Sequence, residues 1–182
     1  MKKQTKITIA SIIFLLVVIV DVYAVICKDK TLEIIFKPLL MTTLAVVYLV
    51  SVKRPNFWLL SALFFSFWGD VFLLDKTNYF VFGLGSFLIA HCLYIVMVKQ
   101  FVKEFNFKEL LICFPPFAII FFGVLQFIKH NLGEMLIPVI VYGLVISVFG
   151  AFTLLNYRQE RTKTNLSLLI GAVLFIASDS LI

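Results

Sequence analysis

Long apolar segments are the feature of this 182-residue chain that most constrains its fold. Seven runs follow one another, at about residues 7–27, 33–52, 57–74, 79–98, 110–128, 135–155 and 166–182. Most reach the roughly 17–25 residues that an α-helix needs to cross the hydrocarbon core of a bilayer. Transmembrane strands would alternate apolar and polar residues, and these runs do not alternate. We therefore predict an all-α fold, a polytopic transmembrane helix bundle with seven helices in this chain.

The connections between the runs are short, which predicts a single transmembrane domain over residues 1–182 with sequential helices as antiparallel neighbours. Hydrophobic residues make up 62% of the chain, well above the roughly half expected of a water-soluble domain. Pro115 and Pro116 interrupt the fifth run, and we expect a kink there because proline removes a helix hydrogen bond. The chain ends inside an apolar run, so we expect a truncated sequence.

Basic residues flank the apolar runs unevenly. Eleven lie at the N-terminus and in the loops on the same side of the membrane, and four lie in the alternate loops. This bias predicts a multi-pass protein of the cell (inner) membrane with its N-terminus in the cytoplasm. It also accounts for the net charge of +6, so no nucleic-acid partner is expected. The first run is too long for a signal peptide, and we interpret it as the first helix.

Two aspartates, Asp70 and Asp179, lie inside otherwise apolar runs. A carboxylate near the middle of a membrane span costs roughly 2.5–3.5 kcal/mol on insertion scales, and it therefore usually faces the bundle interior and has a function. Gly69 precedes Asp70, and Ser178 and Ser180 flank Asp179. Two carboxyl groups inside apolar runs, each beside small or hydroxyl-bearing residues, suggest an acid/base pair.

Other polar groups fall at similar depths. With a rise of about 1.5 Å per residue, Asp70 and Asp179 both lie roughly 20 Å above the cytoplasmic edge, and Lys37 and Tyr142 fall in the same outer layer. Lys37 can reach the outer interface, pair with a carboxylate or bind a phosphate. His91 and Tyr94, three residues apart on one helix face, lie deeper. His91 and Tyr142 also have an alternative interpretation as packing residues.

The sequence indicates no cofactor and no metal site. Only two histidines are present, and the three cysteines have no paired spacing, so neither a zinc site nor a disulfide is expected. Membrane lipids are the expected surroundings, and nothing in the sequence sets an oligomeric state.

Four ordered frames carry a resemblance to a known family. They are Lys37-Pro38-Leu39, Phe65-Ser66-x-x-Gly69-Asp70-x-x-Leu73, Gly85-x-Phe87-x-x-Ala90-His91-x-x-Tyr94 and Gly171-Ala172-x-x-Phe175-x-x-Ser178-Asp179-Ser180. Together they resemble the YhhN/lysoplasmalogenase family of multi-pass membrane proteins. The resemblance implies an eight-helix hydrolase, so a complete member would continue beyond the last frame of this chain.

The resemblance further implies cleavage of the vinyl ether bond of a lysoplasmalogen, a lysophospholipid, to a fatty aldehyde and a glycerophospho-head group. Asp70 and Asp179 match the family's two acidic positions and are the expected catalytic pair. The substrate-binding candidates are Lys37, His91, Tyr94, Tyr142 and Ser178.

A different class of function also fits the intramembrane charges. In a proton-coupled transporter, Asp70, Asp179, Lys37 and His91 would form a proton relay. Inverted repeats or paired broken helices would favour a transporter, and the sequence shows neither.

Overall fold

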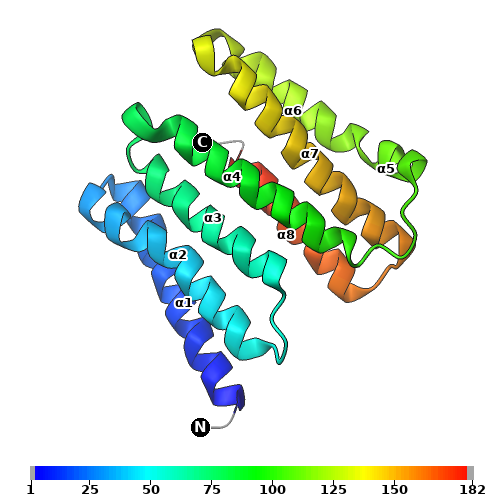
Figure 1. Ribbon diagram of the computed structural model, residues 1–182. Helices are drawn as coiled ribbons and strands as arrows, with labels where there is room; N and C mark the ends of the chain where they lie inside the picture. The colour runs from blue at the N-terminus through cyan, green and yellow to red at the C-terminus, as the bar shows by residue number, and fades with distance from the viewer. Residues whose placement is uncertain (1–2, 180–182) are drawn as a thin grey trace. The chain divides into compact units, whose positions relative to one another are not determined.

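The structure, a computed structural model, describes residues 3–179, with the side chains of Asn131 and Asp179 outside the description. Within this range all regular structure is helical (Figure 1), which confirms the predicted fold class. The first four α-helices are α1 (Lys3–Cys27), α2 (Lys30–Ser51), α3 (Phe57–Leu73) and α4 (Lys76–Lys99). The others are α5 (Phe107–Cys113), α6 (Pro115–Ile128), α7 (Leu136–Gln159) and α8 (Lys163–Asp179), with two short 3-10 turns between α6 and α7.

Polar residues in the loops begin several of these helices. The Asp29 carboxylate accepts hydrogen bonds from the backbone of Thr31 and Leu32 at the start of α2. Asn56 caps α3 in the same way, and Asn106 caps α5. These side chains satisfy backbone N–H groups that have no partner within the helix. Loop chemistry therefore sets where these apolar runs become helical.

Four of the described helices, α1, α2, α4 and the segment containing α7, are long and apolar enough to cross a membrane. The predicted fifth run forms α5 and α6, which meet at a bend of 44° and together make one further candidate span. The bend lies at Phe114, directly before Pro115 and Pro116, which confirms the predicted kink. The remaining apolar helices, α3 and α8, have 17 residues each.

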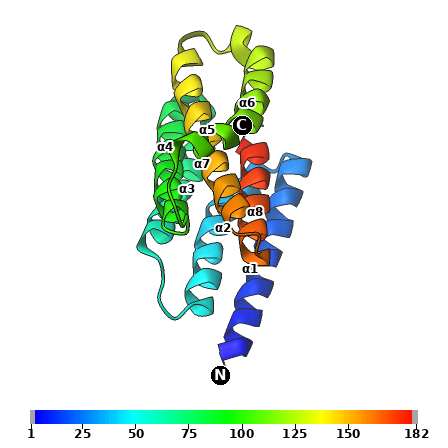
Figure 2. The ribbon, with the colours of Figure 1, turned by 90° about the vertical axis from the view of Figure 1, so that its right-hand side faces the viewer.

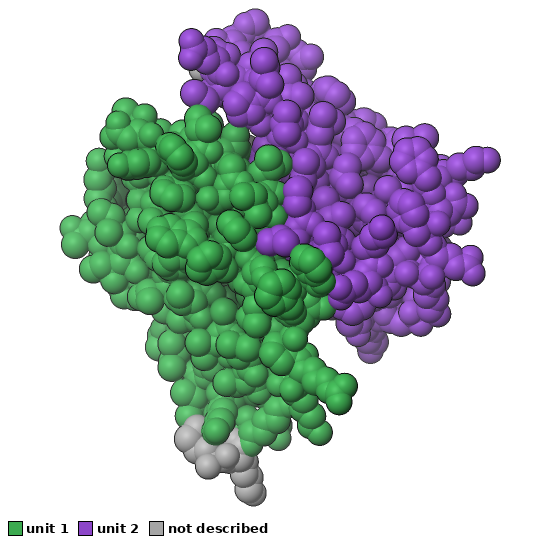
Figure 3. Space-filling model, viewed as in Figure 1, with its two compact units in different colours: residues 1–90 green, residues 91–182 purple. Residues whose placement is uncertain are grey.

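The chain divides into two compact units, residues 1–90 and 91–182 (Figure 3). The predicted single domain stays a prediction, and each unit is described by itself. In the first unit α2 packs against both α1 and α3 (Figures 1 and 2). The first part of α4 packs on α3 at two glycines, because the ring of Phe87 lies against Gly69 and the side chain of Leu73 lies against Gly83.

The second unit is organised around α7. This helix packs against α5, α6 and α8, and most of its residues from Tyr142 to Asn156 are buried. Phe117 and Phe121 of α6 lie against Gly150 and Gly143 of α7, so two missing side chains let these helices approach closely. The last part of α4, from His91, also belongs to this unit.

Candidate functional site

Lys37 lies in the second turn of α2 and forms an ion pair on its own helix. Its ammonium group is 2.9 Å from the Glu33 carboxylate, and both side chains are partly buried. Asp21 of α1 lies within electrostatic range of both groups, and its Oδ1 atom is shielded from the surface. Lys37 is thus the cation of a small charged cluster with two carboxylates, and the partner that the structure shows for it is Glu33 on its own helix.

Asp70 lies on α3 where this helix meets α4. A Cβ atom at Gly69 would lie 2.5 Å from the Phe87 ring, so the backbone just before Asp70 is in direct contact with α4. Ser66, one turn earlier, is completely buried, and the Asp70 Oδ2 atom is shielded from the surface. The carboxyl group therefore belongs to a packed part of the first unit.

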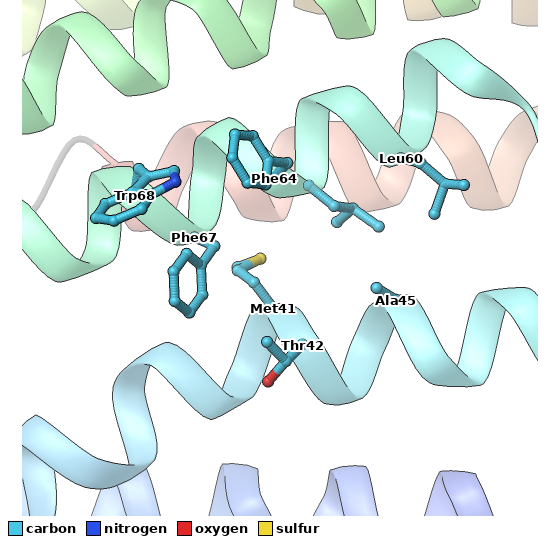
Figure 4. Close-up of a pocket in the computed structure, with 8 residues that line it drawn as sticks. Met41, Thr42, Ala45, Leu60, Phe64, Phe67 and Trp68 are labelled. Carbon is cyan, nitrogen blue, oxygen red and sulfur yellow. The ribbon is translucent and has the colours of Figure 1, made fainter.

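An apolar groove lies between α2 and α3 (Figure 4). Its volume is about 320 Å³. Met41, Thr42 and Ala45 form the α2 wall, and the α3 wall contains Leu60, Leu63, Phe64, Phe67 and Trp68. In Figure 4, Met41 and Phe67 approach each other across the groove at the end that Trp68 also occupies.

The second unit holds an aromatic cluster around His91, which we call the His91 cluster: His91, Tyr94, Tyr142, Phe149 and Phe175. The ring centroid of His91 lies 6.0 Å from Tyr94, 5.5 Å from Tyr142, 5.6 Å from Phe149 and 5.1 Å from Phe175. The His91 side chain is 0% exposed. Three helices, α4, α7 and α8, thus enclose one imidazole in rings.

Two rings of this cluster carry hydroxyl groups, because Tyr94 and Tyr142 are both tyrosines. The polar groups of this cluster are therefore an imidazole and two phenols, and in a buried position hydrogen bonds and charges act more strongly than in water. Such a cluster can hold or transfer a proton and can orient an oxygen atom.

Helix α8 connects this cluster with the second predicted catalytic residue. Phe175 contacts His91, and the backbone of Asp179 follows one turn later as the last residue of α8. The Asp179 side chain lies outside the description, as does the structure of Ser180. Ser178 is exposed on the same turn.

The structure therefore places Lys37 and Asp70 in the first unit, and it brings His91, Tyr94 and Tyr142 together in the second. The pairing of Asp70 with Asp179 joins residues of different units and stays a prediction. Sequence reasoning did not include Glu33, although its spacing of four residues from Lys37 indicates the ion pair. It also missed Phe149 and Phe175 as neighbours of His91. No pattern marks Phe149, and Phe175 was visible only inside the last frame.

Within residues 3–179 no group of three or more histidine, cysteine, aspartate or glutamate side chains could hold a metal ion.

Comparisons with known proteins cover most of the chain. The family model described as the YhhN family matches residues 32–182. Two curated proteins named lysoplasmalogenase, from Mycobacterium bovis and Mycobacterium tuberculosis, are each 32% identical to this chain over 136 residues. The alignment covers 72% of this chain and 50% of each relative, so the chain spans about half the length of the curated relatives it matches. No solved structure matches it.

Proposed function

The chain belongs to the YhhN family, and we propose that it is a membrane-embedded hydrolase that cleaves the vinyl ether bond of a lysoplasmalogen or a related lyso-ether lipid. The observation that carries the proposal is the 32% identity to two proteins named lysoplasmalogenase. The apolar helices of the chain suit a substrate that resides in the bilayer. The products would be a fatty aldehyde and a glycerophospho-head group.

The reaction requires one proton donor and one base. A proton is delivered to the carbon–carbon double bond of the vinyl ether, which leaves an oxocarbenium ion. Water adds to this cation and loses a proton to the base, and the resulting hemiacetal collapses to aldehyde and alcohol. Glycoside cleavage with inversion has the same needs, one protonated carboxyl group and one ionised carboxylate.

Asp70 and Asp179 are the proposed carboxyl pair. A low-dielectric environment favours the neutral form of a carboxyl group, and two neighbouring carboxyl groups titrate at different pH values. One aspartate could then hold the proton while the other remains ionised. The packed position of Asp70 and the placement of Asp179 one turn beyond Phe175 support this assignment.

The remaining candidates would bind and orient the substrate. Lys37 would contact the head-group phosphate, which would join the Glu33 carboxylate as an anionic partner of the same ammonium group. His91, Tyr94 and Tyr142 would orient water or a substrate oxygen from the His91 cluster. Ser178, exposed beside Asp179, would contribute a hydroxyl group.

The proposed setting is the cell (inner) membrane with the N-terminus in the cytoplasm. The uneven flanking charge supports this orientation. The charged cluster of Lys37, Glu33 and Asp21 would then lie near the outer interface, where a lipid phosphate is found. Cysteine accessibility at Lys53 and at Lys76, each replaced by cysteine in a Cys27→Ser/Cys92→Ser background, would test this topology from the two sides of the membrane.

Purified Asp70→Asn and Asp179→Asn variants test the chemistry. With lysoplasmalogen in mixed micelles, each should release aldehyde about 100- to 10,000-fold more slowly than the wild type, the range typical of lost acid–base catalysis. Asp75→Asn is the matched control, because Asp75 lies five residues beyond Asp70 in an exposed loop. Wild-type rates in folded Asp70→Asn protein would refute the catalytic pair. Folded wild-type protein that releases no aldehyde would contradict the hydrolase.

A further inference from the structure

The groove between α2 and α3 presents a hydrocarbon surface. Thr42 carries the one hydroxyl group of its lining, and this hydroxyl donates a hydrogen bond to the Leu39 carbonyl on its own helix at 3.0 Å. Phe64 and Trp68 form an aromatic rim and are well exposed. No charged side chain lines the groove, so an apolar ligand would fill it without leaving a charge buried.

Two charged residues lie on the faces of α2 and α3 that line the groove, beyond one end of its lining. On α3, Asp70 follows Phe67 by three residues and Leu63 by seven, so all three lie on one helix face. On α2, Lys37 precedes Met41 by four residues and therefore shares its face. Met41 and Phe67 mark this end of the groove (Figure 4), and Lys37 and Asp70 come next on the same two helix faces.

We propose that this groove holds the single hydrocarbon chain of the lysolipid substrate, with the ether bond at the Asp70 end and the phosphate toward Lys37. The inference rests on the proposed function. A volume of about 320 Å³ corresponds to on the order of ten groups the size of a water molecule or a methylene. From Leu60 to Trp68 the groove follows eight residues of α3, or roughly 12 Å along the helix axis.

A flexible chain suits this surface better than a helix from a second copy does. Close packing of membrane helices needs small residues at the contact, whereas Phe64 and Trp68 project at the rim of this groove. A lipid chain can follow the space between such rings, and it can enter sideways from the bilayer. The chain would lie parallel to the helices, as lipid chains do in the membrane.

Filling the groove tests the proposal through chain-length preference. Ala45→Phe places a ring in the α2 wall, and Val46→Phe is the matched control, since Val46 is the next residue, 50% exposed and outside the lining. With Ala45→Phe, kcat/KM for a long-chain lysoplasmalogen should fall about tenfold, the size expected for overpacking a site. Activity on a short-chain analogue should stay near that of the wild type. Equal chain-length profiles for the two variants would overturn the proposal.

A binding experiment separates the groove from the reaction. The probe is a lysophospholipid with one saturated ether-linked chain that carries a diazirine near its methyl end, and it cannot undergo vinyl ether cleavage. Photolabelling of the full chain should mark residues 41–45 or 60–68, and Ala45→Phe should reduce this label severalfold while Val46→Phe does not. This result together with an absence of aldehyde release would support the groove and reject the proposed reaction. Label spread evenly over lipid-facing helices, or a changed oligomeric state with unchanged label, would overturn the groove.

Discussion

The ring of Phe121 on α6 occupies the position that a side chain of Gly143 on α7 would need. Phe117, one turn earlier on α6, has the same relationship with Gly150. Two phenyl rings four residues apart thus pack against two glycines seven residues apart, and both pairs lie on facing sides of the helices. In a bilayer, where burial from water does not drive helix association, such close packing is a main source of stability.

Gly143→Ala should therefore destabilise the second unit. The added methyl group meets the Phe121 ring, and overpacking of this kind costs about 1–3 kcal/mol. Gly123→Ala is the control, because a Cβ atom at Gly123 of α6 meets nothing within 4 Å. The measurement is the temperature at which the buried thiol of Cys113 reacts with a fluorogenic maleimide in a Cys27→Ser/Cys92→Ser background. Equal temperatures for the two variants would contradict the role of Phe121.

The helices of this fold could be predicted from the sequence because membrane thickness sets the length of an apolar run. Prolines also act locally, so the bend before Pro115 and Pro116 followed from their positions alone. The ion pair of Lys37 with Glu33 is likewise local, and its spacing is visible in the sequence.

The surroundings of His91 could not be predicted in this way. Its ring neighbours Tyr142, Phe149 and Phe175 come from α7 and α8, which are far away in the sequence. The chain contains 21 phenylalanines. The sequence alone does not show which few of their rings enclose a polar group. Only packing distinguishes those rings from lipid-facing ones.

Substitutions at His91 should separate packing from chemistry. His91→Phe keeps a ring among its four aromatic neighbours and should fold with a stability close to that of the wild type. His91→Ala leaves a cavity in a fully buried position and should cost about 2–5 kcal/mol, as large-to-small core changes do. Thermal unfolding in detergent gives the stabilities. If the imidazole orients a reactant, the His91→Phe protein should no longer release aldehyde although it remains stable. Full activity in this variant would show that His91 serves packing and not the reaction.

Asp75 should make stability depend on pH at the start of α4. Its carboxylate accepts hydrogen bonds from the side chain of Asn78 at 2.8 Å and from the Asn78 backbone at 3.3 Å. The side-chain bond is the main cause that holds the pKa of Asp75 below its usual value. A carboxyl group with a lowered folded-state pKa stabilises the fold at pH values above its unfolded pKa. This contribution is lost as the pH falls through the folded pKa.

The comparison with Asp75→Asn measures this effect, because asparagine can also cap a helix but does not titrate. The difference in unfolding temperature between the wild type and Asp75→Asn should be constant above about pH 5 and should shrink in acid. A difference that stays constant down to acid pH would contradict the contribution of the carboxylate.

Gln159, the last residue of α7, holds the loop between α4 and α5. Its Oε1 atom accepts a hydrogen bond from the Lys103 backbone at 3.1 Å, and its Nε2 atom donates to the Glu104 carbonyl at 2.7 Å. Gln159→Ala removes both bonds, each worth about 0.5–1.5 kcal/mol, and should open the loop severalfold more often. Trypsin should then cut after Lys103 correspondingly faster, with cleavage after Lys53 in the same digest as the reference. Gln126→Ala, which removes an exposed amide from α6, should leave the ratio of the two cleavage rates unchanged. An unchanged ratio in Gln159→Ala would show that the other contacts of this loop, the ion pair of Lys103 with Glu160 and the stacking of Phe105 on Phe152, hold it without Gln159.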